Sequence, residues 1–473
     1  GSWSKSFECN PKVATPIVLP SWATMDRLEM EVKIPRMFTI TTDDDVAVYA
    51  MSLNYLSSDG YLVLPKEALG TNYVISSLRN ALWYYQGSIA PWTANVNVPR
   101  SEFGVAATEN GTEVTIELTA DSWSGKYKKG LLHTFTLNRG EVIQFSARDT
   151  GIKALVDYYD PVSDVYIPKM SWIGTDGDAD CDLTGSIVSA TKPVLVLAGH
   201  ERAAAPDDME FAYRDHPDVS RDHLIEQMPP VDVWGQEFIA IGAKRDDMNN
   251  RPPGGDIIRV ISRYENTLVF NNGAFLDSLG QGEYVQFMSG DISHIETTQP
   301  VLVTKYLLTC NSNSWDSLYL GDPDMTVVPP AENMSTFYSI PTIPVSNFTQ
   351  HFVSILVDTA AIDQTTLNSV LIDKRKLGYI PNTRFMYGRF QTFAGEQRLE
   401  SPLPAYMETY GYGMHDSYSL SGGGDFKYLR ELAAKDLDFG TLMIGAKKDS
   451  ITTVYVDVPP SPLADTLEVF RYT

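Results

Sequence analysis

The feature that most constrains the fold of this chain is a pattern of short strands that recurs along its length. A block of the form Thr-x-Pro-Val-x-Val occurs at residues 191–196 and 298–303 and, in weaker form, at residues 42–48 and 401–406. Pro193 and Pro300 are 107 residues apart, and Pro300 and Pro402 are 102 apart. We therefore expect a repeat of about a hundred residues, in which each block is a strand entered through a turn.

Two further elements recur in the same order. The first is an apolar strand that ends in proline and is followed eight residues later by an aromatic side chain. Its copies are Pro65 with Tyr73, Pro230 with Phe238, and Pro330 with Tyr338. The second, Gly-Glu-x-x-Gln-Phe, occurs at residues 140–145 and 282–287, in both cases after an alternating strand. The recurrence of all three elements indicates a duplicated structural unit.

The length of the repeat favours β-sandwich-like units, since a propeller blade needs only about 40–50 residues. We predict an all-β chain of tandem repeated β-sandwich-like units, with a β-propeller as the alternative, and one short C-terminal helix over residues 426–435. The predicted divisions are N-terminal lead-in strands at 1–40, a first β repeat with insertions at 41–190, a second at 191–297, a third at 298–420, and a C-terminal helix with closing strands at 421–473.

Charge limits the classes of partner. The formal net charge is −23, and no stripe of Lys and Arg interrupts the acidic surface, so phosphate backbones and anionic lipid are repelled. No run of about 18 apolar residues is present for a membrane span. We predict no nucleic-acid partner and no membrane insertion.

Three cysteines, Cys9, Cys181 and Cys310, are too few for a disulfide scaffold and too scattered for a zinc knuckle. One bridge with one free thiol is compatible with this count. Sequons at Asn110, Asn333 and Asn347 are candidate glycosylation sites.

An acidic loop is the main candidate for a metal site. Asp176, Asp178, Asp180 and Asp182 stand at alternate positions in a glycine-containing segment, and several such oxygens can converge on Ca²⁺. The glycine and glutamate of an EF-hand are lacking, and a solvated acidic loop is the alternative interpretation. His200 and His223 lie in a neighbourhood rich in aspartate, but no zincin spacing is present, so we interpret them as structural.

Motifs of catalysis are not recognisable in the chain. There is no nucleophile elbow, phosphate loop or dinucleotide fingerprint. The paired carboxylates of a glycosidase have no fixed spacing in sequence, so a glycosidase remains an alternative. Trp83, Tyr84 and Tyr85 fall in an insertion of the first repeat, and aromatic loops added to a rigid scaffold are typical of binding sites. Core packing is the alternative role for these side chains.

A pair of strings carries a family resemblance. Residues 182–200 are DLTGSIVSATKPVLVLAGH, and residues 222–238 are DHLIEQMPPVDVWGQEF. Together they resemble the N-terminal domain of the IgGFc-binding protein family. The similarity continues through residues 255–260 and 282–287 to residues 298–301 and covers roughly residues 40 to 420. The family tends to have cysteines after the Gly-His pair and before the Asp-His pair, and both are absent from this chain.

The resemblance implies a secreted glycoprotein module with no known catalytic role, found in mucus-associated and cell-surface proteins. We therefore expect an extracellular binding or adhesion module that recognises a protein or a glycan. The resemblance implies no cofactor, and Ca²⁺ is a candidate only from the acidic loop described above. The alternatives are a carbohydrate-active hydrolase on a β-propeller and a purely structural spacer. The family's binding of antibody Fc is not transferred, because no residue set for it can be located in this sequence.

Overall fold

A computed structural model describes most of the chain. The described residues are 4–9, 14–19, 29–43, 45–54, 56–80, 99–148, 152–160, 165–173, 181–206, 220–244, 255–310, 320–345 and 347–424. Within these ranges the regular structure is strand, interrupted by short 3₁₀ turns. The predictions of an all-β chain and of repeated units are thus confirmed. The helix predicted over residues 426–435 lies outside the described residues.

Three sets of strands follow the same order along the chain and are named repeats A, B and C. Repeat A contains β4 (Gly70–Val74), β5 (Ser101–Ala107), β6 (Thr112–Glu117), β7 (Leu132–Leu137), β8 (Glu141–Ser146), β11 (Ile187–Ala203) and β12 (Asp222–Gln227). Repeat B contains β13 (Gly235–Ile241), β14 (Ile257–Ser262), β15 (Thr267–Asn271), β16 (Ala274–Leu279), β17 (Tyr284–Met288), β18 (Ile292–Tyr306) and β19 (Met325–Val328). Repeat C contains β20 (Ser335–Thr342), β21 (Phe348–Asp358), β22 (Thr366–Leu367), β23 (Val370–Leu371), β24 (Gly378–Tyr379), β25 (Phe385–Thr392), β26 (Gly395–Gly413) and β27 (Asp416–Ser421).

One long strand organises each repeat. The first part of β11 pairs with β4 and β6, and its second part pairs with β5 and β12. β18 and β26 divide their partners in the same way. Each repeat is therefore a curled pair of sheets that share a strand, which passes from one sheet to the other at an irregularity.

The Thr-x-Pro-Val block marks this crossing point. In β11 the register against β4 shifts between Ser189 and Val194, so Thr191-Lys192-Pro193 lies inside a continuous strand. The prediction of a turn before a new strand was wrong here. The block at 42–48 was also wrongly predicted to be a strand, because its described residues 42–43 and 45–48 lie outside the strands. Proline has no N–H to donate to a neighbouring strand and is confined in sheets to edges and irregularities. A bulge inside a strand therefore accommodates Pro193 as well as a turn does.

Strand register gives the phase of the repeat. Gly70 pairs with Val194, Gly235 with Val301, and Ser335 with Ala405. The equivalent positions 194, 301 and 405 are therefore 107 and 104 residues apart. The divisions drawn from sequence at 190/191 and 297/298 fall inside β11 and β18, because the repeated block lies in the middle of the long strand.

The second recurring element also has one structure in all three places. Pro65, Pro230 and Pro330 each precede a 3₁₀ turn, with φ of −63°, −63° and −67°. The turns are η3 (Lys66–Ala68), η5 (Val231–Val233) and η6 (Ala331–Asn333). The aromatic residue that follows is buried in each copy. Proline fixes the φ that these turns require, and the aromatic anchors the next strand to the core.

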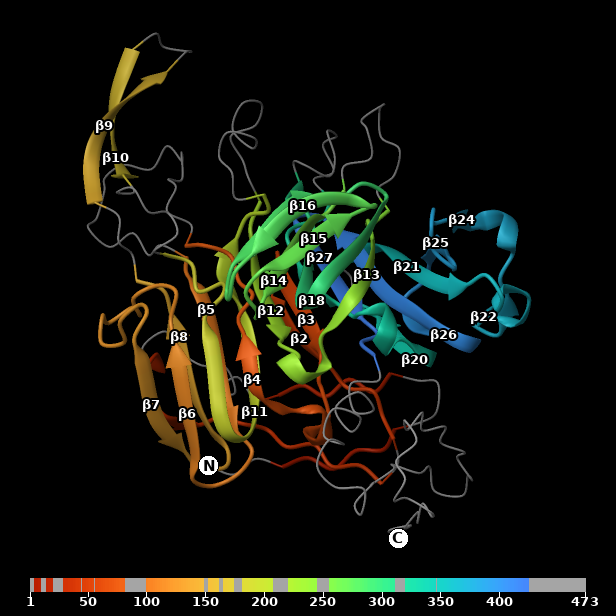
Figure 1. Ribbon diagram of the computed structural model, residues 1–473, viewed down its shortest axis with the longest axis horizontal. Coiled ribbons are helices and arrows are strands. Elements are labelled where there is room, and N and C mark those ends of the chain that lie inside the picture. The colour runs from red at the N-terminus through yellow and green to blue at the C-terminus, as the bar shows by residue number, and fades with distance from the viewer. Residues whose placement is uncertain are drawn as a thin grey trace.

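Four strands meet at the centre of the molecule. The hairpin β2 (Tyr49–Asn54) and β3 (Ser57–Leu62) precedes repeat A. β3 lies against both β12 and β27, and β19 lies between β12 and β27. Figure 1 shows the hairpin, in red, inside the body between the repeats. The N-terminal hairpin thus closes a ring whose other members end repeats A, B and C.

The hydrophobic cores extend across the repeat boundaries. One buried cluster joins Phe145 and Val196 of repeat A with Ile257 and Tyr306 of repeat B. A second joins Ile239 and Ile241 of repeat B with most of the core of repeat C. Because apolar burial is the main stabilising contribution, shared clusters of this kind hold the three repeats in one body.

One insertion distinguishes repeat A. Between β8 and β11 lies a hairpin of β9 (Ile152–Asp160) and β10 (Val165–Ile173), which pair only with each other. Repeats B and C have no described strands at the corresponding place. In Figure 1 this hairpin stands away from the body of the molecule.

Candidate functional site

The central ring holds a cluster of buried carboxyl groups. All come from the inner strands or the residues directly before them, and each residue is at most 4% exposed. They are Asp59 of β3, Asp222 and Glu226 of β12, Asp322 and Asp324 before β19, and Asp416 of β27. Such residues are rarely buried unless they are paired or hydrogen-bonded.

Each carboxyl group joins its own strand to a neighbour. Asp222 accepts bonds from the Ser57 hydroxyl at 2.5 Å and the Ser58 amide at 3.0 Å, both on β3. In the opposite direction, the Ile225 amide of β12 donates to Asp59 at 2.7 Å. The inner strands share no backbone ladder with one another, so these side chains satisfy main-chain donors that would otherwise be buried without partners.

The same arrangement continues round the ring. The Val327 amide of β19 donates to Glu226 at 3.0 Å, and the Ser419 amide of β27 donates to Asp324 at 2.8 Å. The Ser58 hydroxyl of β3 reaches Asp416 of β27 at 3.3 Å. Side-chain bonds therefore connect β3 to β12, β12 to β19, β19 to β27, and β27 to β3.

Burial changes the acidity of these groups. It raises the pKa of Glu226 to about 8, that of Asp324 to about 7 and that of Asp416 to about 6. Burial also raises the pKa of Asp59 well above its ordinary value, and the nearby Asp324 raises it further. Asp59 and Asp324 are bonded to each other, which requires a proton between them because two adjacent carboxylates repel.

This chemistry fits a structural role. A glycosidase needs two carboxyl groups that flank a bound sugar with room for a water or a covalent intermediate. Here the carboxyl groups are enclosed and bonded to main-chain amides, so within the described residues a sugar has no access to them. The hydrolase alternative gains no support from this cluster.

Two buried cations join the repeats in pairs. Lys305 of repeat B donates to both carboxylate oxygens of Glu408 in repeat C, each at 2.7 Å. Arg259 of repeat B donates to Thr184 of repeat A at 2.8 Å, with its guanidinium 4.2 Å from the ring centre of Tyr284. The contacts of Lys305 with Glu408 and of Arg259 with Thr184 fix the relative orientation of the repeats by polar as well as apolar interactions.

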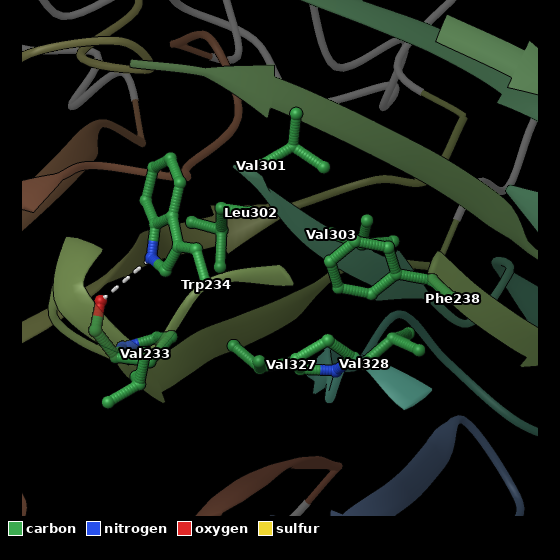
Figure 2. Close-up of a pocket in the computed structure, with 10 residues that line it drawn as sticks. Val233, Trp234, Phe238, Val301, Leu302, Val303, Val327 and Val328 are labelled. Atoms are coloured by element: carbon green, nitrogen blue, oxygen red, sulfur yellow. Dashed lines mark hydrogen bonds between the residues drawn. The ribbon is translucent and has the colours of Figure 1, made fainter. Parts of the chain in front are cut away.

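A small apolar recess lies beside the junction of repeats A and B. Figure 2 shows Trp234 facing Leu302, with its indole Nε1 donating to the Pro229 carbonyl at 3.2 Å. The recess has room for about one water molecule, which is too small for a ligand. Trp234 packs in the cluster shared by repeats A and B, whereas Phe238 lies in a cluster formed by repeat B alone.

The predicted binding and metal residues are only partly covered. Trp83, Tyr84 and Tyr85 lie outside the described residues, as do Asp176, Asp178 and Asp180. Asp182 is buried, and its Oδ1 accepts the Thr184 amide at 2.8 Å in an Asx turn before β11. Within the described part of the chain, no group of three or more His, Cys, Asp or Glu side chains is placed to hold a metal ion.

The sequons differ in exposure. Asn110 and Asn347 are exposed, and the Asn347 Nδ2 donates to Asp416 at 3.4 Å. Asn333 is 1% exposed, and the folded protein has no space for a glycan there. The expectation of glycosylation therefore continues as a proposal for Asn110 and Asn347 only.

The histidines and cysteines have structural surroundings. His200 is fully buried, and its Nε2 lies 3.0 Å from the Arg79 carbonyl, in keeping with the structural role expected for it. Burial lowers the pKa of His200 to about 3.

The described residues, which include all three cysteines, contain no disulfide. Cys310 Sγ lies 3.4 Å from His415 Nδ1, a contact between distant parts of the chain that no spacing in the sequence indicates.

The carboxyl cluster was the main feature that the sequence interpretation missed. Counted back from the aligned prolines Pro230 and Pro330, Asp222 and Asp322 both stand eight residues earlier. Counted back from Pro65 and Pro330, Asp59 and Asp324 both stand six residues earlier. An acidic side chain at a fixed position of a repeated, otherwise apolar strand is the signal that could have located the cluster.

Comparison with known proteins agrees with the family resemblance. The family model described as IgGFc binding protein matches residues 59–411. The human IgGFc-binding protein is 20% identical over 356 residues, which cover 74% of this chain but only 5% of the human protein. No solved structure matches the chain. No helix among the described residues has the length and hydrophobicity needed to cross a bilayer. The match begins within β3 and ends within β26, so it reaches into all three repeats, and this chain belongs to the IgGFc-binding protein family.

Proposed function

We propose that this chain is a non-catalytic binding module of an extracellular protein and that it contacts a protein partner through the insertion of repeat A. Family membership supports a binding role. The shared cores and buried ion pairs give the repeats a fixed relative orientation, which suits a platform that presents loops.

The observation that carries the proposal is the hairpin β9–β10. It is an addition to the repeated strand pattern, and it stands off from the body in Figure 1. Elements added to a rigid scaffold are the usual location of binding residues. Trp83, Tyr84 and Tyr85 fall in the other insertion that the sequence predicts in the first repeat. They remain predicted contacts because aromatic side chains supply large contact area at low entropic cost.

A deletion tests this proposal. Residues 152–173 would be replaced by a short Gly-Ser linker, and binding to immunoglobulin Fc and to a panel of extracellular glycoproteins would be measured by surface plasmon resonance. Fc is the first probe because the human relative is named for it. We expect the intact chain to bind a protein and the deletion to weaken that binding about tenfold or more, with an unchanged melting temperature.

The controls separate the alternatives. Equal binding by the deletion variant would contradict a role for the hairpin. Binding to a glycan array without protein binding, or turnover of fluorogenic glycosides, would contradict the protein-binding module itself. Repeating the assay with EDTA tests calcium at the acidic loop, since loss of a bound ion lowers both affinity and melting temperature.

A further inference from the structure

The three repeats differ at one equivalent strand edge. β8, β17 and β25 are counterparts, because each pairs with a strand that pairs in turn with the long strand of its repeat. The turns before β8 and β17 agree in detail. Gly140 and Gly282 have φ of +85° and +77°, and Glu141 and Glu283 accept the Asn138 and Gly280 amides at 2.7 Å in both copies.

In two repeats a short strand of the same chain covers this edge. β1 (Ile34–Pro35) pairs with β8 and places Ile34 opposite Val142. β24 pairs with β25 and places Gly378 opposite Tyr387. The register of the repeats makes Val142 and Tyr387 equivalent to Tyr284 of β17. On the outer side of β17, however, no described strand is paired.

Apolar side chains of β17 are exposed to solvent at this edge. Tyr284 is 38% exposed and Met288 is 50% exposed, while Val285 and Phe287 pack against the core of repeat B. The Ser289 amide donates inward to the Asp256 carbonyl at 2.8 Å, so the alternation of the ladder points the Met288 amide outward. A strand edge with exposed apolar side chains is a template for an added strand.

The two covering strands show which chemistry fits. Both segments contain an isoleucine followed by proline: Ile34-Pro35 forms β1 itself, and Ile380-Pro381 directly follows β24, two residues beyond the position equivalent to Ile34. Both also carry basic residues beside the strand, at Lys33 and Arg36 and at residues 374–376. The chain has a net charge of −23, and Glu283 is exposed at the start of β17. A basic, extended segment is therefore the complementary occupant.

We propose that the outer edge of β17 binds an extended segment of a partner protein that contains an apolar residue followed by proline and flanking lysine or arginine. The segment adds an antiparallel strand to repeat B, as β1 and β24 do in repeats A and C. The proposal concerns β17 of repeat B and not the hairpin β9–β10, so its test does not depend on the function proposed above.

A peptide-binding experiment tests the inference. The probe is a fluorescein-labelled peptide with the sequence of residues 374–381, and its binding is followed by fluorescence anisotropy with the whole chain. Met288→Pro removes the outward amide and leaves the inner ladder intact, because proline is tolerated at an edge whose donor faces solvent. Met288→Ser is the matched control, which removes the side chain and keeps the amide.

The inference predicts that the wild type and Met288→Ser bind the peptide and that Met288→Pro binds it about tenfold more weakly or not at all. A peptide with glutamate in place of its lysines and arginine should also lose binding. Absence of binding to the wild type, or equal binding by Met288→Pro, would overturn the proposal.

Hydrogen exchange provides a second readout, since the Met288 amide should become protected when the peptide binds. If the wild type fails to bind but a chain ending at Gly424 binds, the edge is covered by the chain's own C-terminal segment, and the partner proposal is wrong.

Discussion

Individual residues in this protein hold the repeats together through buried polar contacts. Lys305 and Glu408 are each 1% exposed and lie in different repeats. The Lys305 ammonium also reaches the Ile241 carbonyl at 3.3 Å, and Tyr406 donates to Glu408 at 3.2 Å. Removing one member of such a pair leaves an unpaired charge in the interior, which costs more than the pair itself contributes.

We predict that Lys305→Met lowers the free energy of unfolding by about 3 to 5 kcal/mol. Urea denaturation followed by tryptophan fluorescence measures this change. The double variant Lys305→Met with Glu408→Gln should recover much of the loss, because no buried charge then lacks a partner. Wild-type stability of the single variant would contradict a bridging role for this pair.

The carboxyl groups of the ring make stability depend on pH. Their pKa values in the folded state, about 6 for Asp416, 7 for Asp324 and 8 for Glu226, lie above the value near 4 of an unfolded carboxyl group. The folded state therefore binds more protons, and this contribution to stability is present at acidic pH and lost as pH rises through 6 to 8.

We predict that urea midpoints fall between pH 5 and pH 9, and that Glu226→Gln reduces the fall. A midpoint that rises over this interval would contradict the protonated cluster.

At the scale of elements, contacts between turns fix the spacing of the repeats. Gly185 has φ of +85°, and a Cβ atom there would lie 2.1 Å from the Gly282 carbonyl oxygen of repeat B. Gly140 also has φ of +85°, but a Cβ atom would have no neighbour within 4 Å. The two glycines share a backbone conformation and differ in their surroundings, so they form a matched pair for substitution.

Gly140→Ala should destabilise the fold by about 1 kcal/mol, the cost of the left-handed conformation. Gly185→Ala should cost about 2 to 4 kcal/mol, because the clash between repeats adds to the same conformational cost. Chemical denaturation of the two variants gives the difference. Equal losses of stability in the two variants would contradict an energetic contribution from the close packing of repeats A and B at Gly185.

The elements also show how far sequence alone could predict the structure. The strands that end at Pro65, Pro230 and Pro330, and the aromatic residue after each, were predictable because proline and a large ring have few local alternatives. The passage of β11 through Thr191-Lys192-Pro193 was not, because a turn and a bulge place similar demands on these residues. The contacts of the carboxyl cluster join residues as distant in sequence as Ser58 and Asp416, which are 358 residues apart, so the sequence indicates the cluster only through the fixed distances of its aspartates from the repeated prolines.

For the whole molecule, closure depends on the N-terminal hairpin. β3 fills the place between β12 and β27 and supplies both donors and an acceptor to its neighbours. The repeats were predictable from sequence, but closure was not, because the weak copy of the repeated block at residues 42–48 lies before the hairpin and outside its strands. A ring closed in this way, with cores that cross the boundaries of the repeats, should open only when the whole molecule unfolds.

Native-state hydrogen exchange measured by mass spectrometry tests this closure most directly. The account predicts that peptides containing β3, β12, β19 and β27 exchange through one opening reaction, with the same free energy as global unfolding in urea. Exchange of β3 at a markedly lower free energy than β12 and β27, or a separate opening of any single repeat, would contradict a closed platform.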